Sequence, residues 1–220
     1  MIWSERLRQR QQADLPTHKE VFLKYEFMEH LRFLTITNVL FYLANILWIL
    51  EFLIFRNRQK IARFKENKSF WFLSLSILVV IVVTIYFSRI NWGMIKNESF
   101  YPIIQILALT FYGLGLWLRY KGSQLLGVHF TRHVAVSSSI TLVSHGPYRY
   151  LRHPLYLGLC IITIAFPLYV GNLFALLISL PLLWIVFSWR MHIEEKALRL
   201  VHPHYADWAK VRYRFIPFIY

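Results

Sequence analysis

Long apolar runs dominate the chain and predict helices that cross a lipid bilayer. Three runs, at 33–55, 70–90 and 101–118, are close to or above the length of about 20 residues that a helix needs to span the hydrocarbon core. Two further runs, 154–170 and 172–189, are separated only by Gly171, so the chain must turn back at once. We therefore predict an all-α integral membrane protein of about five transmembrane helices, ending in a helical hairpin with a short first arm.

The segment before the first run, residues 1–32, is polar and charged. Thr17 and Glu20 have the spacing of a capping box, and an apolar helical face follows them, so both an interfacial helix and a solvated tail fit this segment. It lacks an apolar core followed by a small-residue cleavage site, and we expect no secretory signal peptide. The predicted regions are thus a polar or interfacial segment at 1–32, three spans at 33–119, and the hairpin region at 120–220.

Basic residues in the short loops predict which helix ends face the cytoplasm. Six lysines and arginines lie in 56–68, whereas 91–100 carries only Lys96. Because lysine and arginine are retained on the cytoplasmic side, we expect 56–68 to be cytoplasmic. Alternation then places 120–153 and everything after Trp189 on the same side, in a multi-pass protein whose particular membrane is left open.

The first apolar run leaves the location of the N-terminus undecided. It contains Asn38, Asn45 and Glu51, which are costly toward lipid and normally face a bundle interior. As a single span, this run would put the N-terminus outside. As a re-entrant pair, it would return the N-terminus to the cytoplasm.

Composition and charge support a membrane location and narrow the possible partners. Hydrophobic residues make up 57% of the 220 residues, and charged residues only 16%. Lysine and arginine number 25 against 11 acidic residues, and they lie in short segments between the apolar runs. This placement favours membrane lipids with anionic headgroups over nucleic acid. The single cysteine, Cys160, cannot form an intramolecular disulfide, and the oligomeric state is left open.

Residue types with possible chemistry gather in two stretches, 127–156 and 190–220, which flank the predicted hairpin. A hairpin brings its two ends together. In the first stretch Gly146 and Pro147 predict a turn, while His153-Pro154 suits an extended residue followed by the first position of a helix. On residue types alone this stretch is typical of a basic juxtamembrane loop with interfacial tyrosines. Its glycines, histidine and tyrosines nevertheless fall near a helix start, where backbone donors could meet a ligand.

The second stretch continues helically from the last span and carries Arg190 and Glu194 on one face. They fit either a surface ion pair of small energetic value or a partly desolvated functional pair beside Trp189. The scattered histidines lack the ligand spacing of a zinc site, so we expect no metal. The chain also has no phosphate-binding glycine loop or Gly-x-Ser-x-Gly elbow, which excludes the soluble cofactor folds that use them.

The order of these motifs resembles a known family. The chain reads Leu-Val-x-x-Gly-Pro-Tyr-Arg-Tyr-x-Arg-His-Pro-x-Tyr-x-Gly from Leu142, then an apolar hairpin, then Arg-x-x-x-Glu-Glu from Arg190, and finally Tyr205, Trp208 and Ile216-Pro217-Phe218-Ile219. Over roughly 117–220 it is similar to the isoprenylcysteine carboxyl methyltransferase family and its phospholipid methyltransferase relatives. The chain departs from the family at Val201-His202-Pro203-His204, where a Phe-Gly pair is usual, and this difference could alter substrate choice.

The resemblance implies a site for S-adenosylmethionine, closed by the two stretches. The cofactor-binding residues it implies are Ile140, Thr141, Leu142, Val143, Tyr148, His153, Pro154, Leu155, Tyr156 and Glu194. It also implies that Arg190 faces the substrate, a lipophilic carboxylate such as an isoprenylcysteine that would enter sideways from the membrane. Candidate catalytic residues are Arg190, Glu194 and Glu195, the last of which could help remove a proton from an amine or phenol acceptor.

Other functions remain open from the sequence. A phospholipid amine or a lipid phenol could be the methyl acceptor, and a membrane reductase of the sterol reductase type would use NADPH instead. A non-catalytic membrane protein could keep the same scaffold. The Gly-Pro-Tyr-Arg-Tyr motif and the Arg-x-x-x-Glu-Glu motif favour methyl transfer.

Overall fold

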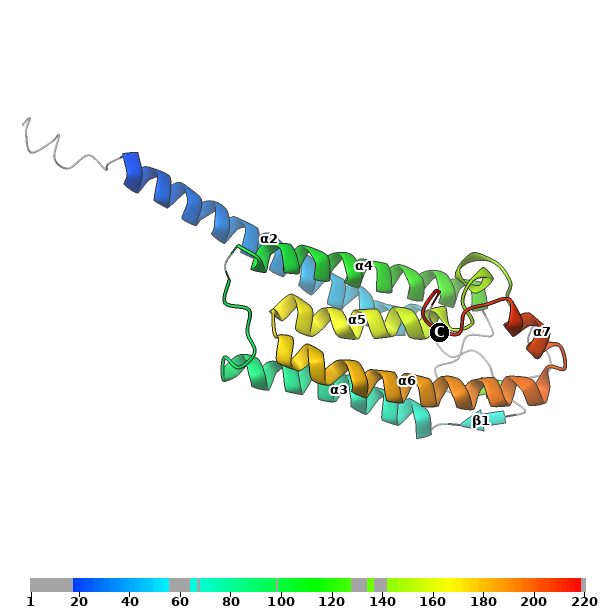
Figure 1. Ribbon diagram of the computed structural model, residues 1–220. Coiled ribbons are helices and arrows are strands. Elements are labelled where there is room, and N and C mark those ends of the chain that lie inside the picture. Colours follow the sequence, from blue (N-terminus) through cyan, green and yellow to red (C-terminus); the bar gives the residue numbers. More distant parts are fainter. Residues whose placement is uncertain are drawn as a thin grey trace, which may run out of the picture. The chain divides into compact units, whose positions relative to one another are not determined.

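Helices make up nearly all of the regular structure. The computed structural model describes residues 18–55, 64–66, 68–97, 99–127, 134–136 and 142–218. The chain divides into two compact units, Met1–Leu40 and Phe41–Tyr220. The elements are α2 (His18–Ile54), β1 (Phe64–Glu66), α3 (Lys68–Arg89), α4 (Tyr101–Leu126), β2 (Val134–Val136), the 3-10 helix η2 (Gly146–Arg149), α5 (Pro154–Val170), α6 (Leu173–Val201) and α7 (Tyr205–Lys210) (Figure 1). The predicted all-α class is confirmed.

Helix α2 runs without a break over 37 residues. No glycine or proline occurs between His18 and Ile54 to interrupt it. The alternative in which 33–55 forms a re-entrant pair is therefore wrong, and residues 18–32 continue the same helix. Thr17, the expected capping residue, lies outside the described residues.

The lengths of the helices confirm a multi-pass membrane protein. Four segments are long and apolar enough to cross a bilayer, namely Leu31–Glu51, Lys68–Arg89, Tyr101–Leu126 and Leu173–Val201. The apolar helix α5 has only 17 residues, which confirms the short first arm of the hairpin. Large apolar side chains such as Trp71 and Leu75 are exposed along α3, as suits a surface that faces lipid.

A two-stranded ribbon was not expected from the sequence. Strand β1 pairs antiparallel with β2, with Phe64 opposite Val136. Strand β2 also contacts α6. The ribbon therefore joins the segment after α2 to the segment that precedes the predicted cofactor-binding motif.

Helices α4 and α5 pack closely side by side in the second unit, and α6 lies along both α5 and α3 (Figure 1). A Cβ atom on Gly115 would lie 2.7 Å from the carbonyl oxygen of Gly158, and one on Gly158 would lie 2.8 Å from that of Gly115. Small residues at a helix crossing allow the two backbones to approach in this way. The glycine that ends the His-Pro-x-Tyr-x-Gly motif is thus a packing residue.

The turn between α5 and α6 lies at Gly171, as predicted. Its φ of 76° is in the left-handed region that glycine adopts readily. Asn172 then caps α6 by accepting a hydrogen bond of 2.9 Å from the backbone N–H of Ala175, and its amide donates to the carbonyl oxygen of Trp92 at 3.1 Å. The hairpin is fixed at this end, so its other end presents the first turn of α5 beside the last turns of α6.

A buried ion pair joins α2 and α4 near the start of α5. Both carboxylate oxygens of Glu51 accept from Arg119, at 2.6 Å from Nε and 2.7 Å from Nη2. Arg119 Nη1 also donates to the carbonyl oxygen of Leu155 at 3.4 Å. The charge of Glu51 is satisfied inside the bundle rather than exposed to lipid.

Candidate active site

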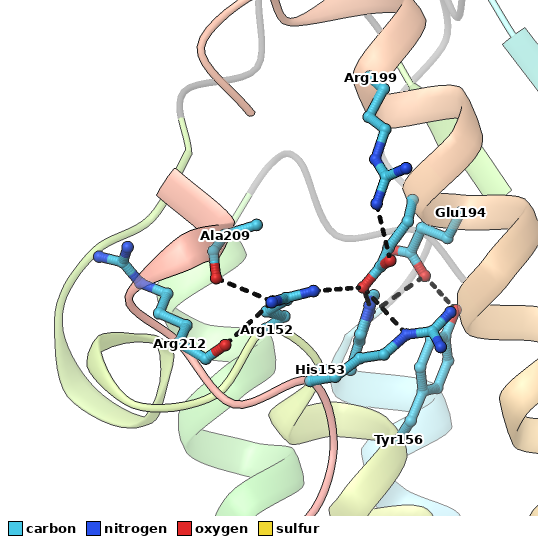
Figure 2. Close-up of polar contacts among 9 residues, drawn as sticks. Arg152, His153, Tyr156, Glu194, Arg199, Ala209 and Arg212 are labelled. Atoms are coloured by element: carbon cyan, nitrogen blue, oxygen red, sulfur yellow. Dashed lines mark hydrogen bonds and ion pairs between the residues drawn. The ribbon is translucent and has the colours of Figure 1, made fainter. Parts of the chain in front are cut away.

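The open end of the hairpin brings together the histidine of α5 and the two glutamates of α6. His153 is the residue before the first turn of α5, and it is buried. Its Nε2 lies 3.2 Å from Oε1 of Glu195, and its Nδ1 lies 3.9 Å from Oε2 of Glu194. Figure 2 shows the imidazole directed at this carboxylate pair. His153 and Glu194 therefore lie close together, as predicted.

Tyr156 connects the two candidate residues on α6. Its ring stacks on that of His153, with centroids 5.5 Å apart. Its hydroxyl donates to Oε2 of Glu194 at 2.5 Å and accepts from Nε of Arg190 at 3.0 Å. Arg190 and Glu194 are thus linked through a tyrosine from the other arm of the hairpin.

Arg190 is held from several directions inside the bundle. Only 2% of the residue is exposed. Its Nη1 donates to the hydroxyl of Ser69, at the start of α3, at 2.8 Å. Its guanidinium carbon also lies 5.3 Å from the centroid of the Tyr156 ring. Three helices therefore fix the position of this cation.

Glu195 is the centre of an ion-pair network. Its Oε1 lies 3.4 Å from Nη1 of Arg152 and 3.2 Å from Nε of Arg214, while its Oε2 lies 3.7 Å from Nη2 of Arg199. Figure 2 shows Arg152, before α5, and Arg199, on α6, each joined by a dashed line to a carboxylate oxygen. A buried carboxylate is tolerated only with such partners, so Glu195 depends on cations drawn from three parts of the chain.

The same network ties the C-terminal segment to the residues before α5. Nε of Arg152 donates to the carbonyl oxygens of Ala209 at 3.1 Å and Arg212 at 3.0 Å (Figure 2). The backbone N–H of Arg152 donates to the carbonyl oxygen of Tyr213 at 2.9 Å. The backbone N–H of Tyr213 in turn donates to the carbonyl oxygen of Tyr150, also at 2.9 Å. The chain after α7 therefore lies along the start of the hairpin.

Trp208 extends this attachment to the first motif. Its indole N–H lies within hydrogen-bond distance of the carbonyl oxygen of Val143 at 3.1 Å and of the Ser144 hydroxyl at 3.0 Å. Arg212 stacks over the Trp208 ring at 4.4 Å and donates to the carbonyl oxygen of Tyr148 at 2.8 Å. Helix α7 is thereby attached to the predicted cofactor-binding stretch.

The remaining predicted cofactor-binding residues are distributed as follows. Leu142 and Val143 are half-buried, while Tyr148 and Pro154 are buried. Burial, with a further contribution from the charge of Glu194, raises the pKa of Tyr148 well above its usual range, so that its phenol stays neutral. Leu155 provides the carbonyl oxygen that Arg119 contacts. Ile140 and Thr141 lie outside the described residues.

Several residues of this site were not singled out from the sequence. Arg152 stands inside the Arg-His-Pro motif, next to a residue that was selected, but its basic character fits a juxtamembrane loop equally well. Ser69 lies far from the motifs in the sequence, and Arg214 stands two residues before the last motif without belonging to it. Only the fold brings these two residues to Arg190 and Glu195, respectively.

The fold and the site define a multi-pass helical membrane protein with a polar centre at the open end of its terminal hairpin. Residues 107–200 match the family model described as the isoprenylcysteine carboxyl methyltransferase (ICMT) family. The resemblance seen in the sequence is confirmed by this match.

Two similar proteins carry the same description. Protein-S-isoprenylcysteine O-methyltransferase of Schizosaccharomyces pombe is 34% identical over 100 residues, which make up 44% of this chain and 42% of that protein. The match thus spans less than half the length of that relative. A solved structure of the eukaryotic intramembrane Ras methyltransferase ICMT matches with a TM-score of 0.55 and 23% identity, over 77% of this chain and 61% of that one. This second likeness shows a shared fold.

Proposed function

We propose that this protein is an S-adenosylmethionine-dependent carboxyl O-methyltransferase that acts on a lipophilic, isoprenylcysteine-like substrate at the membrane. The family match and the name of the fission yeast relative support the reaction class. The observation that carries the proposal is the Tyr156 hydroxyl, which links Glu194 to Arg190. Glu194, which we expect to contact the cofactor, and Arg190, which we expect to contact the acceptor, are thus joined within one site.

The residues of the site suit the proposed cofactor. When bound, S-adenosylmethionine would supply an electrophilic methyl group on a positively charged sulfur. The carboxylate of Glu194, whose side chain is 29% exposed, and the ring of Tyr156 favour a neighbouring positive centre. Tyr148 and His153 are also expected to hold the cofactor, as are the other described residues of the predicted set, Leu142, Val143, Pro154 and Leu155.

Arg190 is the residue proposed to orient the acceptor. A carboxylate acceptor is already anionic at neutral pH and needs no general base. A planar guanidinium can hold it through two parallel hydrogen bonds. Because Ser69 and Tyr156 fix this guanidinium, little additional ordering is needed when the acceptor binds.

The surroundings of Glu195 favour a carboxylate acceptor over an amine. An amine would have to lose a proton, and Glu195 was a candidate to accept it. Arg152, Arg214 and His153 stabilise the negative charge of Glu195, which makes it a weak base. We therefore assign Glu195 a positioning role toward His153 and Arg152.

Calorimetric titration of the purified protein with S-adenosylhomocysteine tests the cofactor assignment. We expect the wild type to bind, and Glu194→Gln to lower the affinity by about tenfold or more, the effect of losing a hydrogen bond to a charged group. The matched control is Glu29→Gln, because Glu29 is an exposed carboxylate on α2. No heat with the wild type would remove the proposal.

Label transfer from S-adenosylmethionine identifies the acceptor. We expect a base-labile methyl ester on a farnesylated N-acetylcysteine and no methylation of phosphatidylethanolamine. If only the phospholipid were labelled, the methyl acceptor would be an amine and not a carboxylate. Binding of NADPH in place of S-adenosylhomocysteine would move the protein to the reductase class.

A further inference from the structure

Tyr205, the first residue of α7, is buried although its hydroxyl has no hydrogen-bond partner among the described residues. Only 1% of the residue is exposed, and its ring stacks on that of Trp208 with centroids 5.7 Å apart. Among the residues that the structure describes, none forms a hydrogen bond with its hydroxyl. Tyr205 belongs to the series of motifs that carries the family resemblance, but the resemblance assigns it no role.

A buried hydroxyl without a partner is costly to the folded protein. The hydroxyl loses its hydrogen bonds to water without replacing them, and the large majority of buried polar side-chain atoms do have a partner. Such a group persists most readily where a ligand completes its hydrogen bonding. The imidazole Nε2 of His202, three residues earlier in the turn that joins α6 to α7, is a second buried polar atom with no partner within the described ranges. Two such atoms in one turn point to a polar ligand there.

Tyr205 is connected to the first stretch of the proposed cofactor site through Trp208. Its ring packs on Trp208, which is hydrogen-bonded to Val143 in the first stretch. Burial, with a further contribution from the charges of Glu195 and Glu194, raises the pKa of the Tyr205 hydroxyl. The phenol therefore stays neutral and can donate a hydrogen bond.

We propose that Tyr205 is a cofactor-binding residue whose hydroxyl donates a hydrogen bond to an acceptor atom of S-adenosylmethionine. This assignment rests on the proposed function and extends its site to α7. The segment just before Tyr205 is where this chain departs from the resembled family. There, this chain has Val201-His202-Pro203-His204 where the resembled family usually has a Phe-Gly pair, and the second unpartnered group, His202, stands in that segment.

The variant Tyr205→Phe removes only the hydroxyl and separates ligand binding from folding. We expect it to weaken S-adenosylhomocysteine binding by about tenfold in calorimetric titration, the effect of one lost hydrogen bond to a buried group. Without ligand, its thermal unfolding midpoint should equal or exceed that of the wild type. The reason is that the variant no longer buries an unpartnered hydroxyl.

Tyr112→Phe is the matched control. Tyr112 is equally buried, at 1% exposed, but its hydroxyl donates to Oδ1 of Asn45 at 3.0 Å. We expect this variant to show the opposite result, a lower unfolding midpoint with unchanged affinity for S-adenosylhomocysteine.

The outcomes separate this proposal from the one on which it rests. Wild-type binding with undiminished binding by Tyr205→Phe overturns the role of Tyr205 and leaves the methyltransferase proposal standing. Reduced affinity together with a lower unfolding midpoint also overturns the role of Tyr205. The hydroxyl would then stabilise the folded protein, as the hydroxyl of Tyr112 does. No binding by the wild type removes both proposals.

Discussion

The two adjacent glutamates of α6 have different surroundings. The side chain of Glu194 is 29% exposed and accepts a hydrogen bond from Tyr156. The side chain of Glu195 is 5% exposed and pairs with Arg152 and Arg214. Neighbouring residues on a helix point about 100° apart around its axis, so one carboxylate can face a ligand while the next holds the surrounding segments together.

The positioning role of Glu195 predicts a large effect on stability. Glu195→Gln removes the charge but keeps the shape, and it leaves Arg152 and Arg214 without their carboxylate. Breaking a buried pair in this way costs about 3–5 kcal/mol, which corresponds to a fall in the thermal unfolding midpoint on the order of 10 °C. The measurement is thermal unfolding of the detergent-solubilised protein.

Asp207→Asn is the control for this variant. Asp207 pairs with Lys210 at 2.8 Å, but both side chains are largely exposed. Surface pairs of this kind contribute little to stability, and the midpoint should stay unchanged. An equal midpoint for Glu195→Gln and the wild type would contradict the proposed network.

At the scale of the elements, the contact between α4 and α5 depends on two glycines. Gly115 and Gly158 meet backbone to backbone, which sets the distance between the helices. Because α5 begins at the candidate site, this crossing also sets where Tyr156 lies relative to α4.

A methyl group at the crossing should therefore destabilise the protein. In Gly115→Ala the new Cβ would lie 2.7 Å from both the Gly158 oxygen and Cγ1 of Ile162. We expect a loss of about 1–3 kcal/mol from overpacking, measured as a lower unfolding midpoint. Gly113→Ala provides the comparison, because nothing lies within 4 Å of a Cβ there. If the two variants behaved alike, the close approach of the helices would be refuted.

The elements were predictable wherever a local pattern determines them. Gly171 alone between two apolar runs was enough to predict the hairpin. The continuity of α2 could have been read from its lack of glycine and proline, but the polar composition of residues 18–32 suggested a separate segment. The three-residue strands β1 and β2 were not predictable, because strands this short carry no alternating pattern and pair across a long separation in sequence.

The site was predictable only in part. The family resemblance carried by the ordered motifs was enough to select His153, Tyr156, Arg190 and Glu194 as candidates, and the structure brings these four residues together. The contacts of Glu195 and the burial of Tyr205 depend on how α6 is rotated and on where the C-terminal segment lies, and neither follows from residue spacing.

At the scale of the whole molecule, the basic loops predict that the candidate site faces the cytoplasm. Lys96 lies in the loop between α3 and α4, at the hairpin-turn end, and Asp207 lies on α7, at the site end; both are exposed. We expect Lys96→Cys to react with a membrane-impermeant maleimide in intact cells or right-side-out vesicles. Asp207→Cys should react only after permeabilisation. The native Cys160 is buried and should add little background. The reverse pattern would place the site on the opposite face.

The short first arm of the hairpin has a consequence for the depth at which chemistry would take place. A helix of 17 residues rises about 26 Å, which is less than the hydrocarbon thickness of about 30 Å. If the Gly171 turn lies at one edge of the acyl chains, His153 lies a few ångströms below the opposite edge, unless the bilayer thins locally to match. A lipid-anchored acceptor could then reach Tyr156 and Arg190 while its tail stays immersed, so that only its polar end would have to move.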